Sequence, residues 1–330
     1  MLLKDEKIFK GEKEVKYLFQ KSYRKTDDLV IVFSAFPPIG KKPGYNYVRT
    51  LDEFDCNKLY ILDDFGARAT YYLCENKEYT IERSVARLIN QVVKENGIKN
   101  IMACGSSKGG YAALYYGIKY GFQHIVVASP QYYLGDYLLE QTNSQSVVKF
   151  MAGNTTQSDH KYLNCILENI IRKSENKPNI FIHLGKGEYH YPMHVKPLLE
   201  ELKSNGIQYE LDLADYNNHN QVIYYYPEIL KNKVRQVLDY PFLKLSMSNT
   251  EHTIGNKLIF KAETTNNEDS IAWYVFKDNK KIQEVKYSEN TKRIEVSLNE
   301  TGRYKIKVFA LNTKRNKVRL NSELIEVRAK

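Results

Sequence analysis

The residues Gly105-Ser106-Ser107-Lys108-Gly109 match the pattern G-x-S-x-G, in which a serine lies between small residues. Before them, residues 99–104 form an apolar run that predicts a strand, and after them residues 108–121 predict a helix. A strand-to-helix turn of this kind strains the backbone of its serine and exposes Oγ above the edge of the sheet. We therefore predict that Ser107 is a nucleophile, with a plain tight turn as the alternative.

A serine nucleophile needs a base, and the base needs an acid that orients it. His219 follows the last predicted strand and precedes the final predicted helix, so it is the predicted base. Glu188 follows the preceding strand and is the predicted acid, which gives the chain order serine, acid, histidine. Asp212 and Asp215 compete with Glu188 because they are closer to His219 in sequence, although they lie on or just after its own strand.

Acyl transfer also needs donors for the oxygen that becomes negative. The predicted donors are the backbone N–H of Lys108 and one N–H from the loop after the first core strand, that of Ala35 or Phe36. Asp63 and Asp64 end another predicted strand and should lie near the same edge of the sheet. They could bind a sugar hydroxyl of a substrate, or they could cap a turn.

No metal or bound cofactor is predicted. His190 and His194 are four residues apart, but Pro192 lies between them and the glutamate of a zinc-binding helix is missing. The four cysteines are scattered, which predicts buried free thiols in a reducing compartment and therefore a cytoplasmic protein. The N-terminus is charged too early for a secretory signal, and no apolar run approaches the roughly 18 residues that a membrane span needs.

Short apolar runs alternate with helical periodicity over the first 240 residues. This alternation predicts a mostly parallel sheet with helices on both faces over residues 1–240. With the serine, the acid and the histidine in that chain order, these residues resemble an α/β-hydrolase-like domain. Residues 130–178 interrupt the alternation and are predicted to be an inserted helical segment near one sheet edge. The predicted strands are 29–35, 58–63, 99–104, 124–129, 179–185 and 207–214, and the predicted helices include 84–93, 108–121 and 221–238.

The pattern changes after Pro241. Residues 303–308 alternate the polar side chains Arg303, Lys305 and Lys307 with apolar ones, and Asp278-Asn279 predicts a hairpin turn. These features predict an all-β sandwich over residues 241–330.

This second domain carries 18 Lys and Arg against 11 Asp and Glu residues, out of a net charge of +10 for the whole chain. Its basic surface could dock an anionic polymer or a protein partner, or could simply be a solvated sheet face. Proteins that bind single-stranded nucleic acid often carry basic runs with interleaved aromatic residues. This sequence has no such run, so nucleic acid is not a predicted partner.

The stretch GSSKGGYAALYYG, residues 105–117, together with the placement of Glu188 and His219, resembles a bacterial group of α/β-hydrolases linked to surface polysaccharides and glycoproteins. That group includes capsule O-acetyltransferases and the acetyltransferase component of accessory secretion systems. The resemblance implies transfer of an acyl group, commonly acetyl, to or from a sugar hydroxyl, and a carbohydrate substrate. The segments AWYVFKDNKKI and GRYKIKVFALN resemble the triple-tyrosine type of immunoglobulin-like module, an accessory unit without catalytic residues.

The leading hypothesis is therefore a serine O-acetyltransferase or O-acetyl esterase that acts on a bacterial surface polysaccharide or glycan, with acetyl-CoA as a possible acyl donor. One alternative is a non-catalytic hydrolase-fold scaffold that binds a partner. Another is a peptidase or general carboxylesterase with the same catalytic groups.

Overall fold

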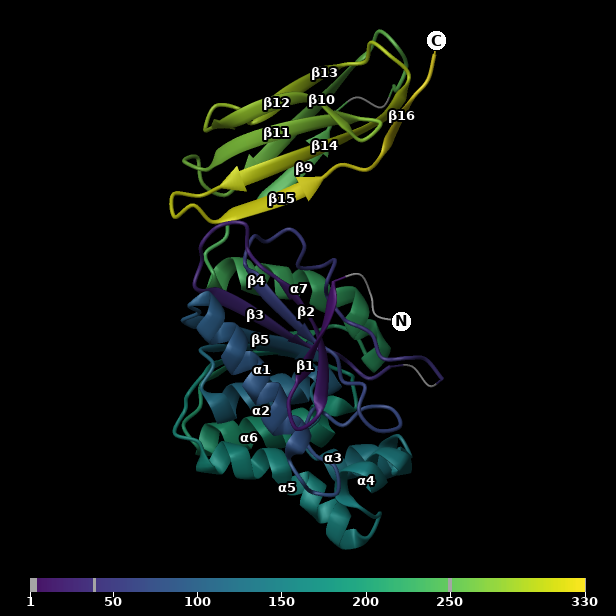
Figure 1. Cartoon of the computed structure of the whole chain (residues 1–330), viewed down its shortest axis with the longest axis vertical. Coiled ribbons are helices and arrows are strands. Elements are labelled where there is room, and N and C mark those ends of the chain that lie inside the picture. The colour runs from purple at the N-terminus through teal and green to yellow at the C-terminus, as the bar shows by residue number, and fades with distance from the viewer. Residues whose placement is uncertain (1–4, 38–39, 249–250, 330) are drawn as a thin grey trace. The chain divides into compact units, whose positions relative to one another are not determined.

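The computed structural model describes residues 5–37, 40–248 and 251–329 of the 330-residue chain. The chain divides into two compact units (Figure 1). The first comprises residues 1–48 and 56–230, and the second comprises residues 49–55 and 231–330. Among the described residues, no helix combines the length and the apolar character that crossing a bilayer would require.

An eight-stranded sheet runs through the first unit in the order β1-β2-β4-β3-β5-β6-β7-β8. The six strands from β3 to β8 are mutually parallel, and the hairpin β1–β2 adds an antiparallel edge beside β4. The mostly parallel sheet is confirmed, whereas the edge hairpin β1–β2 was not predicted. The strands are β1 (Glu6–Lys10), β2 (Glu14–Gln20), β3 (Asp28–Phe33), β4 (Asn57–Ile61), β5 (Asn100–Ser106), β6 (His124–Ala128), β7 (Asn179–Gly185) and β8 (Tyr209–Ala214).

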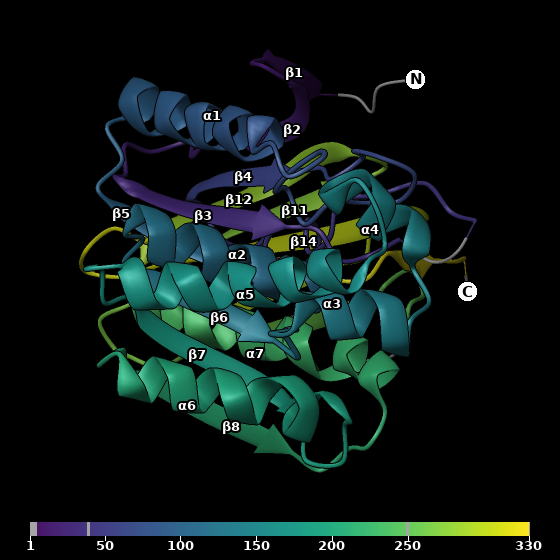
Figure 2. The same cartoon turned by 90° about the horizontal axis from the view of Figure 1, so that it is seen from below.

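Helices cover both faces of this sheet, and α7 lies on the face opposite α1, α2, α5 and α6 (Figure 2). Strand β3 illustrates the division, because Leu29, Ile31 and Phe33 pack into the core formed with those four helices while Val30 and Val32 are buried outside it. The helices are α1 (Thr80–Asn96), α2 (Lys108–Tyr120), α5 (Gln157–Lys173), α6 (Lys196–Ser204) and α7 (Val222–Val237).

The segment between β6 and β7 is helical, as predicted. It contains the short helix α3 (Leu134–Asp136), the π-helical turn η1 (Tyr137–Gln141), α4 (Gln145–Ala152) and α5. Thr156 caps α5, accepting the N–H of Asp159 while the Asp159 carboxylate accepts the N–H of Thr156. Because β6 and β7 are parallel neighbours, their connection needs a crossover, and α5 supplies it on the face of α2. The segment is thus partly an ordinary crossover and not wholly an insertion at an edge.

Two antiparallel sheets make up the second unit. One has the order β13-β10-β9, and the other has the order β12-β11-β14-β15, with β16 also paired to β14. The strands are β9 (Leu243–Met247), β10 (Lys257–Thr264), β11 (Ser270–Lys277), β12 (Lys280–Ser288), β13 (Arg293–Ser297), β14 (Gly302–Leu311), β15 (Lys317–Asn321) and β16 (Ile325–Val327).

The local predictions for this unit are confirmed. Asp278 and Asn279 form the turn between β11 and β12, and both have positive φ angles, as a two-residue hairpin turn requires. Along β14, Tyr304, Ile306 and Val308 are buried, and the cationic residues between them are not. Period-two alternation therefore correctly identified which face of this strand packs inward.

Residues 49–55 belong to the second unit although they lie far away in sequence. Phe54 forms a β-bridge with Val318, and the N–H of Arg319 donates to the carbonyl of Glu53 at 2.9 Å. The Glu53 carboxylate also pairs with Arg235 near the end of α7. These long-range contacts are invisible to local sequence patterns, so the predicted division at Pro241 did not include them.

Candidate active site

Ser107 lies at the turn between β5 and α2, where its backbone has φ 52° and ψ −120°. Non-glycine residues rarely adopt such angles. The flanking glycines make the turn possible, because a Cβ on Gly105 would lie 2.5 Å from the carbonyl carbon of Gly109, and one on Gly109 would lie 2.2 Å from the carbonyl oxygen of Phe33. Both positions therefore admit only glycine in this backbone arrangement.

Ser107, His219 and Glu188 form a continuous hydrogen-bonded chain. The Ser107 Oγ is 3.1 Å from Nε2 of His219, and Nδ1 of His219 is 2.8 Å from Oε2 of Glu188. With Nδ1–H donating to the carboxylate, Nε2 is left as the acceptor for the serine hydroxyl. Ser107 is 7% exposed, and the His219 side chain is 21% exposed. The structure therefore brings together all three residues that the sequence singled out.

Glu188 is held in place by three donors. Besides His219, the Ser129 hydroxyl and the Gly185 N–H donate to its Oε1, at 2.7 and 2.9 Å. Burial alone would raise the pKa of Glu188, but the hydrogen bonds from His219, Gly185 and Ser129 together lower the pKa below its usual value. The carboxylate thus stays ionised beside the imidazole.

The competing acids lie elsewhere. Asp215 is exposed and makes no hydrogen bond or ion pair with any residue that the structure describes. The Asp212 carboxylate lies 2.7 Å from Nδ1 of His183, a fully buried strand residue whose Nε2 contacts the hydroxyl of Tyr216. Both ring nitrogens of His183 thereby have partners within the core, and this arrangement favours Glu188 over both aspartates.

Two buried side chains, Gln131 and His190, contact Ser107 and His219, and neither was predicted to belong to the site. The Gln131 amide donates to Ser107 Oγ at 2.9 Å and lies 3.1 Å from Nε2 of His190. The His190 ring stacks on that of His219, with centroids 4.0 Å apart and planes inclined by 15°. Burial lowers the pKa of His190 to about 2, with smaller contributions from His219 and His194, so this ring stays neutral and adds no charge beside the base.

The predicted oxyanion donors differ in availability. The N–H of Ala35 donates to Oδ1 of Asn46 at 2.9 Å, so Ala35 is occupied and the prediction that it could serve is wrong for this arrangement. The N–H groups of Phe36 and Lys108 have no hydrogen-bond partner among the described residues. Lys108 begins α2, whose first N–H groups lack partners within the helix. These two remain the candidate donors.

The Lys108 side chain has a separate role, since it is fully buried and its Nζ lies 2.8 Å from Oδ2 of Asp63. Asp63 also accepts the N–H groups of Thr70 and Tyr72 and the Thr70 hydroxyl. Its oxygens are fully engaged and unexposed, which favours the structural alternative over sugar binding. Asp64 is partly exposed and pairs with Lys16.

The described residues include two groups whose atoms are close enough to hold a metal ion. One is Glu188, His190 and His219, whose contacts are already accounted for by the chain of hydrogen bonds to Ser107. The other is Asp136, Glu140 and His160, in which His160 Nε2 lies 2.8 Å from Oδ1 of Asp136. The Glu140 side chain is 65% exposed, and exposed acidic groups of this kind occur commonly without an ion.

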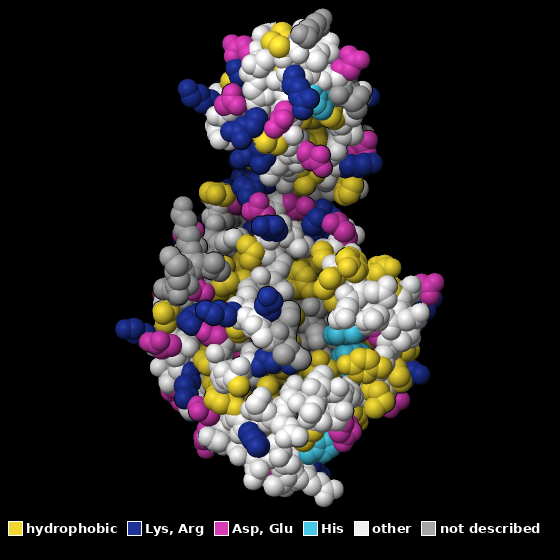
Figure 3. Space-filling model, turned by 90° about the vertical axis from the view of Figure 1, so that its right-hand side faces the viewer, with side chains coloured by type: hydrophobic (Ala, Val, Ile, Leu, Met, Phe, Trp, Pro, Cys, Tyr) yellow, Lys and Arg dark blue, Asp and Glu magenta, His cyan; other side chains and the backbone are white. Residues whose placement is uncertain are grey.

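Exposed apolar side chains follow the site residues in sequence. Tyr189 and Met193 come just after Glu188, and Ile223 and Tyr224 come just after His219. All four are at least 42% exposed, and Tyr224 is 75% exposed. In Figure 3, histidine side chains reach the surface of the first unit beside a group of hydrophobic side chains. Large exposed apolar groups next to a buried polar site are typical of a ligand-binding rim.

Comparison with known proteins adds to this geometry. Residues 61–193 match a family described as an uncharacterised protein family, UPF0227. None of the curated proteins compared with the chain is similar to it. Among solved structures, the capsule O-acetyltransferase of Neisseria meningitidis serogroup A is 28% identical, with a TM-score of 0.59, over 67% of this chain and 91% of that one. A variant of that enzyme was solved in complex with CoA.

Two more distant structures show the fold alone. The Gap123 glycosylation-associated protein complex of Streptococcus agalactiae is 16% identical, with a TM-score of 0.58, over 67% of this chain and 44% of that one. A fluorophosphonate-binding serine hydrolase of Staphylococcus aureus is 13% identical, with a TM-score of 0.50, over 68% and 92%. The chain thus has a hydrolase-like fold shared by acyltransferases and serine hydrolases, and these likenesses support acyl transfer or hydrolysis in general.

The buried Lys108–Asp63 pair predicts a strong dependence of stability on both partners. Replacing Lys108 by Met leaves the Asp63 carboxylate buried without its counter-charge, which costs about 3–5 kcal/mol. We expect denaturant unfolding of Lys108→Met to show a loss of this size, and the double variant with Asp63→Asn to recover part of it. A single variant as stable as the wild type would contradict this role for the pair.

The two buried histidines predict acid sensitivity of folding. Burial lowers the pKa of His190 to about 2 and that of His194 to about 4, against about 6.5 when unfolded. Below the unfolded pKa the unfolded chain binds protons that the folded chain does not, so stability falls as pH falls. Each histidine should cost about 2 kcal/mol at pH 5 relative to pH 7. In His190→Gln, the loss of unfolding free energy between pH 7 and pH 5 should be smaller by that amount than in the wild type, as measured by denaturant unfolding at both pH values. An equal loss in the variant and the wild type would contradict this prediction.

Proposed function

We propose that this chain is a serine-nucleophile O-acyltransferase that transfers an acetyl group to a sugar hydroxyl of a bacterial surface polysaccharide or glycan. The single observation that carries the proposal is the chain of contacts from Ser107 Oγ through His219 to the buried Glu188 carboxylate. This is the arrangement by which a weak hydroxyl nucleophile is activated. A non-catalytic scaffold would have no need for the strained serine or for a carboxylate held by three donors.

The proposed chemistry has two balanced halves. In the first, Ser107 Oγ attacks the acyl carbonyl while His219 Nε2 takes its proton, and the C–S bond of a thioester donor breaks as the departing sulfur receives that proton. In the second, a sugar hydroxyl gives its proton to His219 as its oxygen attacks the acyl-serine, and Ser107 leaves with the proton. Glu188 orients His219 and stabilises its charged form in both halves.

Two backbone groups are proposed to stabilise the oxyanion, the N–H of Lys108 and that of Phe36. Each such donor is worth roughly 10²–10³ in rate. Gln131 donates to Ser107 Oγ, which we propose helps to fix the rotamer of the serine.

Acetyl-CoA is proposed as the acyl donor, as a substrate and not a bound cofactor. The support is the neighbour at 27% identity that was solved with CoA, together with the exposed apolar side chains beside the site, which suit the uncharged arm of such a donor. The polysaccharide acceptor rests on the capsule O-acetyltransferase at 28% identity. Hydrolysis remains the second candidate function, because the fold is shared with serine hydrolases.

The first test concerns the nucleophile. Wild-type protein should react with a fluorophosphonate probe and release acetyl from p-nitrophenyl acetate, and Ser107→Ala should lose probe labelling together with at least about 10⁴-fold of the rate. Acetyl release from acetyl-CoA that rises when sugar acceptors are added would identify a transferase, and release that is unaffected by acceptors would identify an esterase. If the wild-type protein is not labelled, the proposal of a serine nucleophile is wrong. If Ser107→Ala is still labelled, Ser107 is not the nucleophile.

The second test concerns the acid. Glu188→Gln should lower the rate by about 10⁴-fold, because the amide can donate to Nδ1 and so select the wrong tautomer of His219. Asp215→Asn is the matched control and should leave the rate unchanged. Steady-state kinetics with p-nitrophenyl acetate measures both, and the opposite pattern would assign the acid to Asp215.

A further inference from the structure

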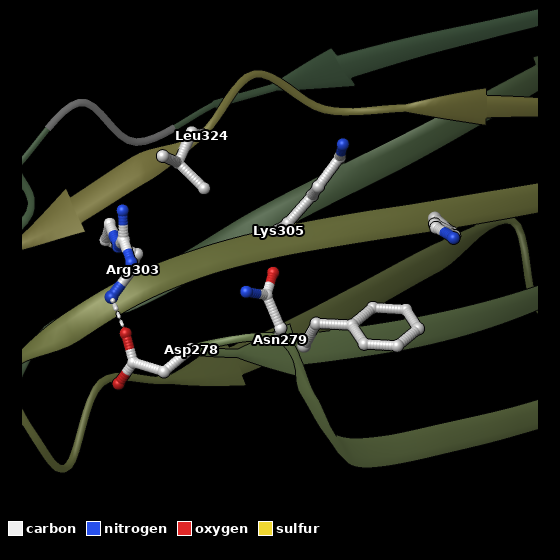
Figure 4. Close-up of a pocket in the computed structure, with 7 residues that line it drawn as sticks. Asp278, Asn279, Arg303, Lys305 and Leu324 are labelled. Atoms are coloured by element: carbon white, nitrogen blue, oxygen red, sulfur yellow. Dashed lines mark hydrogen bonds between the residues drawn. The ribbon is translucent and has the colours of Figure 1, made fainter. Parts of the chain in front are cut away.

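The second unit carries a hollow on the exposed face of its larger sheet. Its volume is about 280 Å³, and its lining includes Asp278, Asn279, Arg303, Lys305 and Lys307. In Figure 4, Arg303 and Lys305 lie on β14 between Leu324 on one side and Asp278 with Asn279 on the other. The three cations occupy alternate positions of one strand, so they project from the same face at intervals of about 7 Å.

These cations form no ion pair with the residues that the structure describes. Among the described residues, no carboxylate lies within 4.0 Å of the charged nitrogens of Arg303, Lys305 or Lys307, whereas neighbouring Lys277 and Lys281 pair with Glu300 and Glu284. Asp278 lines the hollow but accepts the backbone N–H of Arg303 at 3.0 Å. Three cations and one carboxylate, that of Asp278, line the hollow, so it carries net positive charge and attracts a polyanion.

Two aromatic rings of the same face, Phe276 and Tyr274, each have a lysine over them. Lys307 Nζ lies 5.1 Å from the centroid of the Phe276 ring, and Lys281 Nζ lies 4.6 Å from that of Tyr274. Proteins that bind single-stranded nucleic acid offer open aromatic faces on which bases stack. Because lysines lie over these two rings, neither ring offers that side to a base, and charge is what these residues present.

We propose that this hollow, lined by Arg303, Lys305 and Lys307, binds an acidic polysaccharide, and that it holds the polymer whose hydroxyls the first unit acylates. The choice of polymer rests on the proposed function, while the binding surface rests on the charges of β14. The spacing along the strand suits a chain that carries anionic groups at intervals and does not suit a single small anion.

Polymer binding by the full-length Ser107→Ala protein tests this, because acetyl transfer cannot alter the ligand in that background. Polygalacturonate is the probe, neutral dextran is the uncharged control, and a 20-residue oligo(dT) tests for nucleic acid. We expect polygalacturonate to bind with an affinity that falls as salt rises, and dextran not to bind. The double variant Lys305→Gln/Lys307→Gln should weaken binding by about tenfold or more and reduce the log–log salt slope by about one to two.

The matched control is Lys244→Gln/Lys257→Gln, which removes the same charge from exposed positions of the smaller sheet. It should change affinity by less than about twofold. Arg303→Gln serves as a second variant should the double variant unfold, since the backbone contact to Asp278 is kept. Equal losses in both double variants, no loss in either, or tighter binding of oligo(dT) than of polygalacturonate would overturn the proposal.

Activity on p-nitrophenyl acetate separates this proposal from the proposed function. With Ser107 intact, Lys305→Gln/Lys307→Gln should release acetyl at the wild-type rate, because this small substrate needs no polymer site. Loss of polymer binding with full esterase activity supports the docking surface. An inactive wild-type protein that still binds polygalacturonate through Lys305 and Lys307 would remove the acyltransferase function and leave the surface intact.

Discussion

The site depends on a close approach of three backbone segments. The end of β5 lies against the start of α2, and the start of α2 lies against the end of β3. Gly109 lies so close to the Phe33 carbonyl that a side chain has no room, and Gly105 lies almost as close to the backbone of Gly109. This contact fixes where α2 begins and forces Ser107 into its strained conformation. This strain costs on the order of 1–3 kcal/mol of folding free energy, and favourable packing of the surrounding core must offset it. The serine is thus positioned by backbone packing before any of its polar partners act.

Buried polar contacts then hold the elements around this turn. Lys108 is the first residue of α2, and its side chain reaches Asp63, just after the end of β4. The ion pair therefore links the region after β5 to the region after β4, although β3 lies between these two strands in the sheet. Glu188 similarly joins the loop after β7 to Ser129 at the end of β6. Each link is buried, so it is screened little by solvent and fixes geometry at the carboxyl ends of the strands.

Much of the first unit could be read from local patterns, because apolar runs and helical periodicity report burial directly. Ser107, Glu188 and His219 were identifiable because each follows a predicted strand, and chain order then suggested their roles. Gln131 and Ser129 also follow a strand, and this placement was the signal that could have revealed them. Local sequence patterns do not say which residues meet in space. The stacking of His190 on His219 and the hydrogen bond from the Ala35 N–H to Asn46 could therefore not be predicted from them.

The long-range contacts of residues 49–55 show the same limit and have a consequence of their own. These residues lie between β3 and β4 in the chain, yet Phe54 and Glu53 are bonded to β15 and to the end of α7. The second unit is therefore built from two separate segments of the chain, residues 49–55 and 231–330. A truncation at residue 240 would remove Val318, the β-bridge partner of Phe54, and the N–H of Arg319 that donates to the Glu53 carbonyl. The C-terminal unit is not a detachable tail, and its loss or exchange would have to be accompanied by changes in a loop almost two hundred residues upstream.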